Sequence, residues 1–413
     1  MKIDGFSVGW HGVDITPQDP TPLDGMGHDY ERQKNWIPAN REEDRLKASV
    51  IVIADGVSEE NTVVLCTMDT LFIHAEFAVP TAEKIAQALN IPGGNVFFCA
   101  SHTHSGVSMD EPDPSVITYI QWLQPVLVAA AKEAMADLTP ARVQIGSLET
   151  TGMNAQRRYI LLDGSHHSTV GDKTFTSEDI KSFESQPDPT LRAIRFLRQG
   201  KEDVLLVNWQ IHPGFTGSST LGRVSADMVG TIRTYFEQTQ PECKFAFFQG
   251  AAGNMGKGTR WEKAPWYAKC KSFDRDGYSR EFVRLLKEDM AFADVNTGAI
   301  TVKNTKLTVN RKTGDQILDE SWDLPLNTIT FGDVAICTAP AELFSDSGLE
   351  IRKRSDYKMT FVSTCTNGNY GYLPIKASFA GDPEFKSFEV KVSKCQPGTA
   401  EKIVDQLSAM LKV

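Results

Sequence analysis

The chain has 413 residues and a formal net charge of −10, because 53 aspartates and glutamates outnumber 43 lysines and arginines. An acidic chain without a basic run repels a nucleic-acid backbone, so we expect no nucleic acid as partner. No apolar run approaches the ~18 residues that a membrane helix needs, and the N-terminus lacks a charged segment followed by an apolar one, so we expect neither stable membrane insertion nor a signal peptide.

Seven cysteines are scattered along the chain, an odd number without any Cys-x-x-Cys pair. Several of them fall in apolar, strand-like runs. This pattern predicts reduced, buried thiols rather than a disulfide framework or a thiolate zinc site, and therefore a cytoplasmic protein. The seven are Cys66, Cys99, Cys243, Cys270, Cys337, Cys365 and Cys395.

The first third of the chain alternates apolar, strand-like runs with helical patterns. Residues 48–54 and 62–68 are predicted strands, and a helix over 77–89 separates them from a third strand that ends at Ala100. Apolar residues at roughly helical spacing then predict a long helix over 115–138.

The middle third repeats this alternation. The predicted strands cover 142–148, 191–197, 203–211 and 244–249, and the predicted helices cover 226–238 and 278–293. Between them, the polar stretch 163–188, which contains His166 and His167, predicts a long mobile loop or lid.

In the last third, strands are predicted over 299–309, 328–331, 334–338 and 359–364, and helices over 341–354 and 399–411. Gly332 and Asp333 predict a hairpin turn between two of these strands. No repeat and no low-complexity linker divides the chain. The sequence therefore predicts a single α/β domain over residues 1–413, with a mixed sheet.

Two histidines one residue apart, His102 and His104, follow the apolar strand that ends at Ala100. Only eight histidines occur in the chain, and strands of this kind commonly present functional groups where they end. If the strand geometry continues, alternation puts both rings on the same side, which suits shared work at a metal or an anion.

Three other predicted strands also run into polar, turn-rich ends, which deliver His212, Glu342 and Tyr372. If these ends share one face of a sheet, two imidazoles, a carboxylate and a phenol converge, and zinc accepts such nitrogen and oxygen ligands. Each residue also has a structural explanation. His212 is explained as a hydrogen-bonded core residue, Glu342 as a complement to a helix N-terminus, and Tyr372 as packing.

Seven short motifs occur in a fixed order along the chain. They are Gly12-Val13-Asp14-Ile15-Thr16-Pro17, Ser101-His102-Thr103-His104-Ser105-Gly106, Asn208-Trp209-Gln210-Ile211-His212-Pro213-Gly214, Ser225-Ala226-Asp227, Phe248-Gln249-Gly250-Ala251-Ala252-Gly253-Asn254, Pro340-Ala341-Glu342-Leu343-Phe344 and Asn367-Gly368-Asn369-Tyr370-Gly371-Tyr372-Leu373-Pro374. In this order they resemble the catalytic domain of the neutral/alkaline non-lysosomal ceramidase family, over most of the chain. The resemblance implies a mixed-sheet α/β sandwich and a zinc amidase that cleaves an N-acyl bond.

The resemblance also implies roles for individual residues. His102, His212, Glu342 and Tyr372 are the implied zinc ligands. It places His104 beside the metal as a contact for substrate or water, and Arg157 resembles the family's active-site arginine.

This chain departs from the family at the active-site serine, because Gly256 stands at that position in Gly253-Asn254-Met255-Gly256-Lys257. A serine nucleophile is therefore excluded there. The family's C-terminal immunoglobulin-like domain is also missing from this sequence. We therefore expect a shorter, cytoplasmic relative that acts on a small molecule other than membrane ceramide, with Gly253, Asn254 and Lys257 contacting the substrate. The sequence gives no indication of the oligomeric state.

A reaction without the serine remains available, because zinc lowers the pKa of bound water to ~7. His104 or Asp227 would accept the proton, and Arg157 would bind an anionic group or the oxyanion. Asp227 has a second explanation in the first turn of the helix that follows it, and Lys257 has one as a solvated cation.

Three functions stay open at this point: a zinc hydrolase of an amide or related acyl bond, a metal-dependent lyase or isomerase of a sugar-like compound, and a ligand-binding protein without turnover. A nucleotide-hydrolysing loop is excluded, because Ala251 and Gly258 break the G-x-x-x-x-G-K-[ST] pattern in the glycine-rich stretch.

Overall fold

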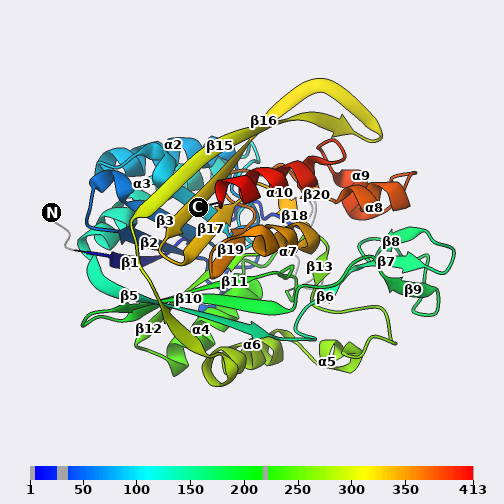
Figure 1. The fold of residues 1–413 in the computed structure, drawn as a ribbon, viewed down its shortest axis with the longest axis horizontal. Coiled ribbons are helices and arrows are strands. Elements are labelled where there is room, and N and C mark those ends of the chain that lie inside the picture. Colours follow the sequence, from blue (N-terminus) through cyan, green and yellow to red (C-terminus); the bar gives the residue numbers. More distant parts are fainter. Residues whose placement is uncertain (1–4, 26–35, 217–221, 413) are drawn as a thin grey trace.

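The computed structural model describes residues 5–25, 36–216 and 222–412. Two mixed sheets pack face to face, and helices cover the outer face of each (Figure 1). The protein therefore has the mixed-sheet α/β sandwich that the family resemblance implies.

The larger sheet has the order β12-β11-β10-β5-β1-β2-β3-β4, and β14 pairs with β5 beside this path. Most neighbours in it are antiparallel, but β3 and β4, and β11 and β12, run parallel. Its strands are β1 (Ser7–Asp14), β2 (Lys47–Ala54), β3 (Val63–Met68), β4 (Val96–Ala100), β5 (Thr139–Glu149), β10 (Thr190–Arg198), β11 (Asp203–Trp209), β12 (Cys243–Gln249) and β14 (Phe292–Val295).

The smaller sheet has the order β15-β16-β17-β19, and a long hairpin projects from it at the top of Figure 1. Its strands are β15 (Ile300–Thr313), β16 (Gln316–Phe331), β17 (Val334–Thr338) and β19 (Met359–Ser363). Shorter pairs join β6 (Ala155–Gln156) to β13 (Met255–Gly256) and β18 (Glu342–Leu343) to β20 (Tyr372–Leu373). A three-stranded sheet holds β7 (Arg158–Leu161), β8 (His166–Ser168) and β9 (Ile180–Phe183).

Apolar side chains from the facing sides of both sheets form one buried core, in which Phe248 of β12 lies against Phe361 of β19 with ring centroids 6.1 Å apart. The outer face of β2–β4 packs against α2 (Ala75–Leu89) and α3 (Pro114–Ala136). The outer face of β10–β12 packs against α4 (Asp227–Thr239) and α6 (Arg275–Arg284). The smaller sheet packs against α7 (Ser345–Arg354) and α10 (Thr399–Met410).

Three further helices are short: α5 (Tyr267–Lys271), α8 (Lys376–Gly381) and α9 (Phe388–Val392). Helix ends follow local capping rules where the sequence offers them. Asp113 accepts a hydrogen bond from the backbone N–H of Ser115 at 2.8 Å, and Pro114 occupies the first position of α3. Asn90 ends α2 in the left-handed conformation, with φ of 56°.

The prediction of a long loop over 163–188 is wrong, because this stretch contains β8 and β9, which pair with β7. Its few apolar side chains, Ile180 and Phe183 among them, are buried in a small core together with residues about 80 positions further along the chain. The polar composition of this stretch therefore gave no sign that its few apolar residues pack against a distant part of the chain. His166 and His167 are not free in solvent either, since they pair with Glu184 and Asp172.

Two predicted helix boundaries are also wrong. Instead of the helix predicted over 278–293, the α-helix ends at Arg284 and a π-helical turn follows over Leu285–Asp289. The residues after this turn cannot be helical, because they join the larger sheet as β14. The helix predicted from residue 341 begins at Ser345, because Glu342 and Leu343 pair with β20 instead. The seven cysteines are buried, as the sequence predicts, and no disulfide joins them in the structure.

Replacing Phe248 by alanine should destabilise the protein by about 3–5 kcal/mol, because the ring is fully buried between the two sheets and its loss leaves a cavity. Urea unfolding followed by circular dichroism measures this change. The matched control is Leu162→Ala, whose side chain is 69% exposed and should cost no more than about 0.5 kcal/mol. Equal losses in the two variants would contradict the face-to-face packing.

Candidate metal centre

The four predicted ligands meet where separate strands end. His102 comes two residues after β4, and His212 comes three residues after β11. Glu342 and Tyr372 stand directly opposite each other at the start of the parallel pair β18 and β20. The fold therefore gathers two imidazoles, a carboxylate and a phenol from four distant parts of the chain.

The donor atoms of His102, His212 and Glu342 lie within contact distance of one another, and the Tyr372 hydroxyl lies within contact distance of His212. The Nε2 atoms of His102 and His212 are 3.1 Å apart. Glu342 Oε2 lies 3.3 Å from the first of these nitrogens and 3.1 Å from the second. The hydroxyl of Tyr372 is 3.0 Å from His212 Nε2. The donors of His102, His212 and Glu342 thus face a common point, and the Tyr372 hydroxyl approaches it beside His212.

Backbone carbonyls fix how both histidine rings are protonated. His102 Nδ1 lies 3.0 Å from the carbonyl oxygen of Leu71, and His212 Nδ1 lies 2.8 Å from that of Ala252. A carbonyl oxygen only accepts hydrogen bonds, so each Nδ1 must carry the proton. When both rings are neutral, as metal binding requires, both Nε2 lone pairs face Glu342, which is the arrangement that metal-binding histidines adopt.

Glu342 is the electrostatic centre of the group. Its side chain is 4% exposed, and its Oε2 has no hydrogen-bond partner of acceptable geometry in the described part of the chain. Burial raises the pKa of this carboxyl, but the contact with His102 outweighs burial and holds the pKa well below its usual range. A buried carboxylate requires a compensating positive charge. A proton on His102 supplies it here, since burial lowers the pKa of this ring but Cys365 and Glu342 outweigh burial and raise the pKa well above its usual value. A bound cation would supply the same charge with both rings neutral.

The donor set and its spacing fit zinc. Zinc bonds of about 2.0–2.1 Å to nitrogen and oxygen in a tetrahedron place the ligand atoms about 3.3 Å apart. The three distances that end at Glu342 Oε2 or join the two imidazoles are 3.1, 3.1 and 3.3 Å. The residues present therefore match the group that the sequence resemblance implies.

The other histidine of the pair, His104, lies beside this set. Its ring centroid is 5.1 Å from that of His102 and 5.6 Å from that of His212, and the donor nitrogens of all three lie within 4.8 Å of one another. Burial and the two neighbouring imidazoles lower the pKa of His104 well below its usual value. His104 is therefore a neutral, half-buried base next to the ligands.

The backbone at His102 and at the neighbouring Cys365 is strained. The strand does not continue past Ala100 as the sequence suggests, because His102 adopts a left-handed conformation with φ of 65°. Cys365, whose thiol sulfur lies 3.7 Å from His102 Nδ1, has φ of 52°. Such conformations cost about 1–3 kcal/mol each and are concentrated at functional sites, where the surrounding contacts enforce them.

The predicted arginine lies against Tyr372. Arg157 is buried and donates from Nε to Glu389 Oε1 and from Nη2 to the carbonyl oxygen of Gly253, both at 2.8 Å. Its guanidinium carbon is 5.5 Å from the centroid of the Tyr372 ring. Nothing in the local sequence around Glu389 marks it as part of the site, because its partner Arg157 is 232 positions away.

Asp227 has both carboxylate oxygens engaged. The backbone N–H groups of Phe215, Thr216 and Met228 and the hydroxyl of Thr216 donate to them. Asp227 is also fully buried, with a left-handed φ of 51°. It holds the segment just after His212 in place.

In the glycine-rich segment 253–257, the backbone of Gly253 contacts Arg157, whereas the side chains of Asn254 and Lys257 bond to other parts of the protein. Asn254 accepts from Ser345 N at 2.8 Å and donates to Asp346 at 3.0 Å, so its side chain ties this segment to α7. Lys257 donates from Nζ to the carbonyl oxygen of Gly214 at 3.0 Å and lies over the ring of Phe215. Lys257 is therefore anchored beside the His212 segment.

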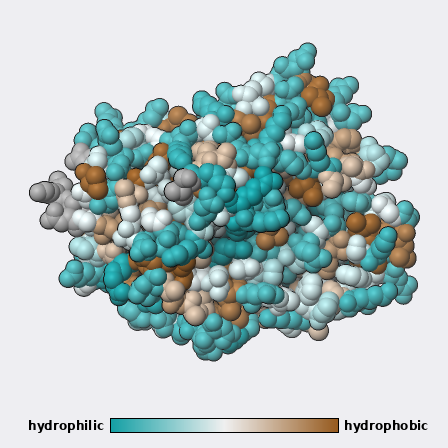
Figure 2. All heavy atoms as spheres, viewed as in Figure 1, coloured by the Kyte–Doolittle hydropathy of each residue, from teal (hydrophilic) through white to brown (hydrophobic). Residues whose placement is uncertain are grey.

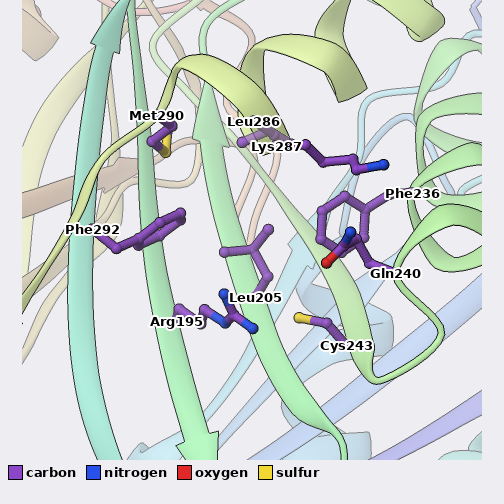
Figure 3. A pocket seen from close by; sticks show the side chains of 9 residues that line it. All are labelled: Arg195, Leu205, Phe236, Gln240, Cys243, Leu286, Lys287, Met290 and Phe292. Carbon is purple, nitrogen blue, oxygen red and sulfur yellow. The ribbon is translucent and has the colours of Figure 1, made fainter.

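A separate pocket of about 100 Å³ lies between the β10–β12 part of the larger sheet and the end of α6 (Figure 3). Leu205, Phe236 and Phe292 line it, and Arg195 at its edge is paired with Asp203. None of the residues around this pocket belongs to the metal centre.

Polar side chains cover most of the face shown in Figure 2, with apolar side chains in small separate groups. Among the described residues, the helices are all too short or too polar to cross a membrane.

No family model and no curated protein matches this sequence. The solved structures that resemble it include "Ceramidase complexed with C2" and the neutral ceramidase from Pseudomonas aeruginosa. Both have a TM-score of 0.71 and 15% sequence identity, and the match covers 99% of this chain and 75% and 74% of theirs. At this identity the likeness establishes a ceramidase-like fold.

Replacing His102 by alanine should abolish zinc binding, because it removes one nitrogen donor and the partner of Glu342. Elemental analysis of purified protein should find about one zinc per chain in the original protein and close to none in the variant. His167→Ala serves as control, since this ring pairs with Asp172 outside the centre. Unchanged zinc content in His102→Ala would refute the ligand assignment.

Two glycines of the glycine-rich segment, Gly253 and Gly256, should respond differently to substitution by alanine. A Cβ on Gly253 would come within 2.6 Å of the backbone oxygen of Glu342, whereas a Cβ on Gly256 would have its nearest neighbours at 3.9 Å. We expect Gly253→Ala to displace Glu342 and weaken zinc binding at least tenfold, about the size of effects from residues that support metal ligands.

Gly256→Ala should keep the zinc affinity and lie within about 0.5 kcal/mol of the original free energy of unfolding. Competition with a chromogenic chelator measures both affinities. Similar affinities for the two variants would show that the close approach of Gly253 to Glu342 does not support the centre.

Proposed function

We propose that this protein is a zinc-dependent hydrolase that cleaves an amide or related acyl bond in a small, polar substrate. The observation that carries the proposal is the buried Oε2 of Glu342, which lies 3.3 Å from His102 Nε2 and 3.1 Å from His212 Nε2 and has no hydrogen bond of acceptable geometry among the described residues. A mixed nitrogen and oxygen donor set of this kind is typical of zinc, and the ceramidase-like fold supports an amide or acyl bond as the target.

When bound, zinc would supply Lewis-acid activation of a water molecule and of the substrate carbonyl. His102, His212, Glu342 and Tyr372 would hold it. The remaining groups of the site act on the substrate and on protons.

His104 is the residue best placed to accept a proton. Its ring is neutral, half-buried and within reach of the ligand nitrogens of His102 and His212. Asp227, the other predicted acceptor, already receives hydrogen bonds at both oxygens. We therefore assign proton transfer to His104 and the support of the His212 segment to Asp227.

Arg157 is assigned to the developing negative charge on the substrate oxygen. Glu389 and the Gly253 carbonyl hold the guanidinium in place next to Tyr372, so its position is set before the substrate arrives. Lys257, which donates to the Gly214 carbonyl, adds a second cation near the segment that follows His212. These cations and His104 favour a polar substrate.

The activity is tested with the zinc-loaded protein and a panel of N-acyl amino acids, short acyl esters and an N-acyl sphingoid base in micelles. The proposal predicts release of a carboxylic acid from the small polar members, detected by mass spectrometry, and loss of that release after chelation. A zinc-loaded protein that cleaves no member of the panel would contradict it.

Replacing His104 by alanine should lower kcat by about 10²–10⁴, the usual contribution of a general base, while zinc content stays unchanged. The two measurements together separate proton transfer from metal binding. If zinc is lost along with activity, His104 is a ligand instead. If activity is retained, the proton goes elsewhere.

A further inference from the structure

Helix α9 lies against the metal centre from outside the ligand set. Three consecutive residues at its start reach three different side chains of this region. Ser387 accepts a hydrogen bond from Arg158, Phe388 meets the ring of Tyr372, and Glu389 accepts from Arg157. One short segment thus contacts both a candidate ligand and the cation beside it.

The carboxylate of Glu389 is completely buried and fully hydrogen-bonded. Its Oε1 accepts from Arg157 Nε at 2.8 Å and from the hydroxyl of Ser168 at 3.0 Å. Its Oε2 accepts from Arg158 Nη1 at 2.9 Å. Burial raises the pKa of this carboxyl, but the two arginines outweigh burial and lower it. Glu389 is therefore a fixed negative charge between two fixed positive ones.

Arg157 links Glu389 to Tyr372, because its guanidinium bonds to Glu389 and lies over the Tyr372 ring. With Nε bound to Glu389 and Nη2 bound to the Gly253 carbonyl, the plane of the guanidinium is set on two sides. The group lies over the Tyr372 ring, with its carbon 5.5 Å from the ring centroid. A cation over an aromatic face is attractive, and more so where water is excluded.

The second contact to the ring comes from Phe388. Its ring meets Tyr372 edge-on, with centroids 5.7 Å apart and an angle of 75° between the planes, which is a favourable aromatic geometry. The ring of Tyr372 is also parallel to that of His212, at 8° and 6.1 Å. The phenol is thus held by a cation, an aromatic edge and a stacked imidazole.

We propose that Glu389 is a positioning residue of the metal centre. It fixes Arg157 over the ring of Tyr372 and, together with the neighbouring Phe388, sets the direction in which the phenol oxygen points. The inference rests on the proposed function in one respect, namely that Tyr372 is a metal ligand. Loss of the Glu389 charge frees Arg157, and the phenol then loses its fixed orientation.

Glu184 provides a matched control for the charge and the burial of Glu389. Its side chain is 2% exposed, and it accepts from Arg158 Nε at 2.7 Å and Nη2 at 2.9 Å. The side chains of His166 and Ser378 complete its hydrogen bonds. Both glutamates therefore neutralise Arg158, but among the described contacts only Glu389 also bonds Arg157.

The test compares Glu389→Gln with Glu184→Gln in the full chain. The readouts are zinc affinity, by chelator competition, and the visible absorption spectrum of the Co²⁺-loaded protein, which reports the ligand set. We expect Glu389→Gln to weaken zinc binding by about 10–100-fold, the usual effect of losing a group that orients a ligand, and to alter the Co²⁺ spectrum. Glu184→Gln should retain both the affinity and the spectrum, even where it lowers the unfolding temperature.

Two outcomes would overturn the inference. In the first, folded Glu389→Gln binds zinc with the original affinity and spectrum. In the second, Glu184→Gln weakens binding as much as Glu389→Gln, which would show that only the shared pairing with Arg158 matters. If Glu389→Gln does not fold, Phe388→Leu decides, because this half-buried ring touches Tyr372 directly. An unchanged Co²⁺ spectrum in Phe388→Leu contradicts the inference.

The experiment separates the inference from the proposed function. An original protein that takes up no metal contradicts the proposed function and removes the basis of the inference with it. An original protein that binds zinc, together with an equally tight Glu389→Gln, contradicts the inference alone.

Discussion

The structure depends on one electrostatic constraint, the burial of the Glu342 carboxylate against two imidazole nitrogens. Moving a carboxylate out of water costs several kcal/mol unless a partner compensates it. Here Oε2 lies 3.3 Å from the Nε2 atom of His102 and 3.1 Å from that of His212, and the carbonyls of Leu71 and Ala252 hold a ring proton on each opposite nitrogen. A cation at the common point satisfies the carboxylate and both lone pairs together, which is why we regard this group as a metal centre.

The two-sheet sandwich explains how these residues meet. Strands β4 and β11 of the larger sheet deliver the histidines, while the segments that follow β17 and β19 of the smaller sheet deliver Glu342 and Tyr372. The centre therefore lies where strand ends of both sheets converge, and the shared apolar core between the sheets fixes their separation. The left-handed backbone at His102 shows that the final approach requires local strain that the packed sheets enforce.

Strands of the larger sheet could be predicted from their apolar runs, and His102 from its place after one of them. Residues that depend on partners far away in the sequence could not be predicted in this way. Glu389 lies in an ordinary polar stretch, and only the folded chain brings Arg157 to it. Strands β8 and β9 escaped prediction for the same reason, since their polar sequence becomes a sheet only against β7 and the apolar residues that follow the glycine loop. The family resemblance pointed to the four candidate ligands, which the fold brings together. The carbonyl partners of the two histidines, the left-handed backbone at His102 and the Arg157–Glu389 pair required the structure.

The central claim is that zinc is held by nitrogen and oxygen alone, although the Cys365 thiol lies 3.7 Å from His102 Nδ1. X-ray absorption spectroscopy at the zinc edge of the purified, untreated protein tests this most directly. The account predicts nitrogen and oxygen neighbours at about 2.0–2.1 Å with imidazole scattering beyond them. A sulfur neighbour at about 2.3 Å, or the absence of zinc from the protein, would contradict the assignment of His102, His212, Glu342 and Tyr372 as the ligands.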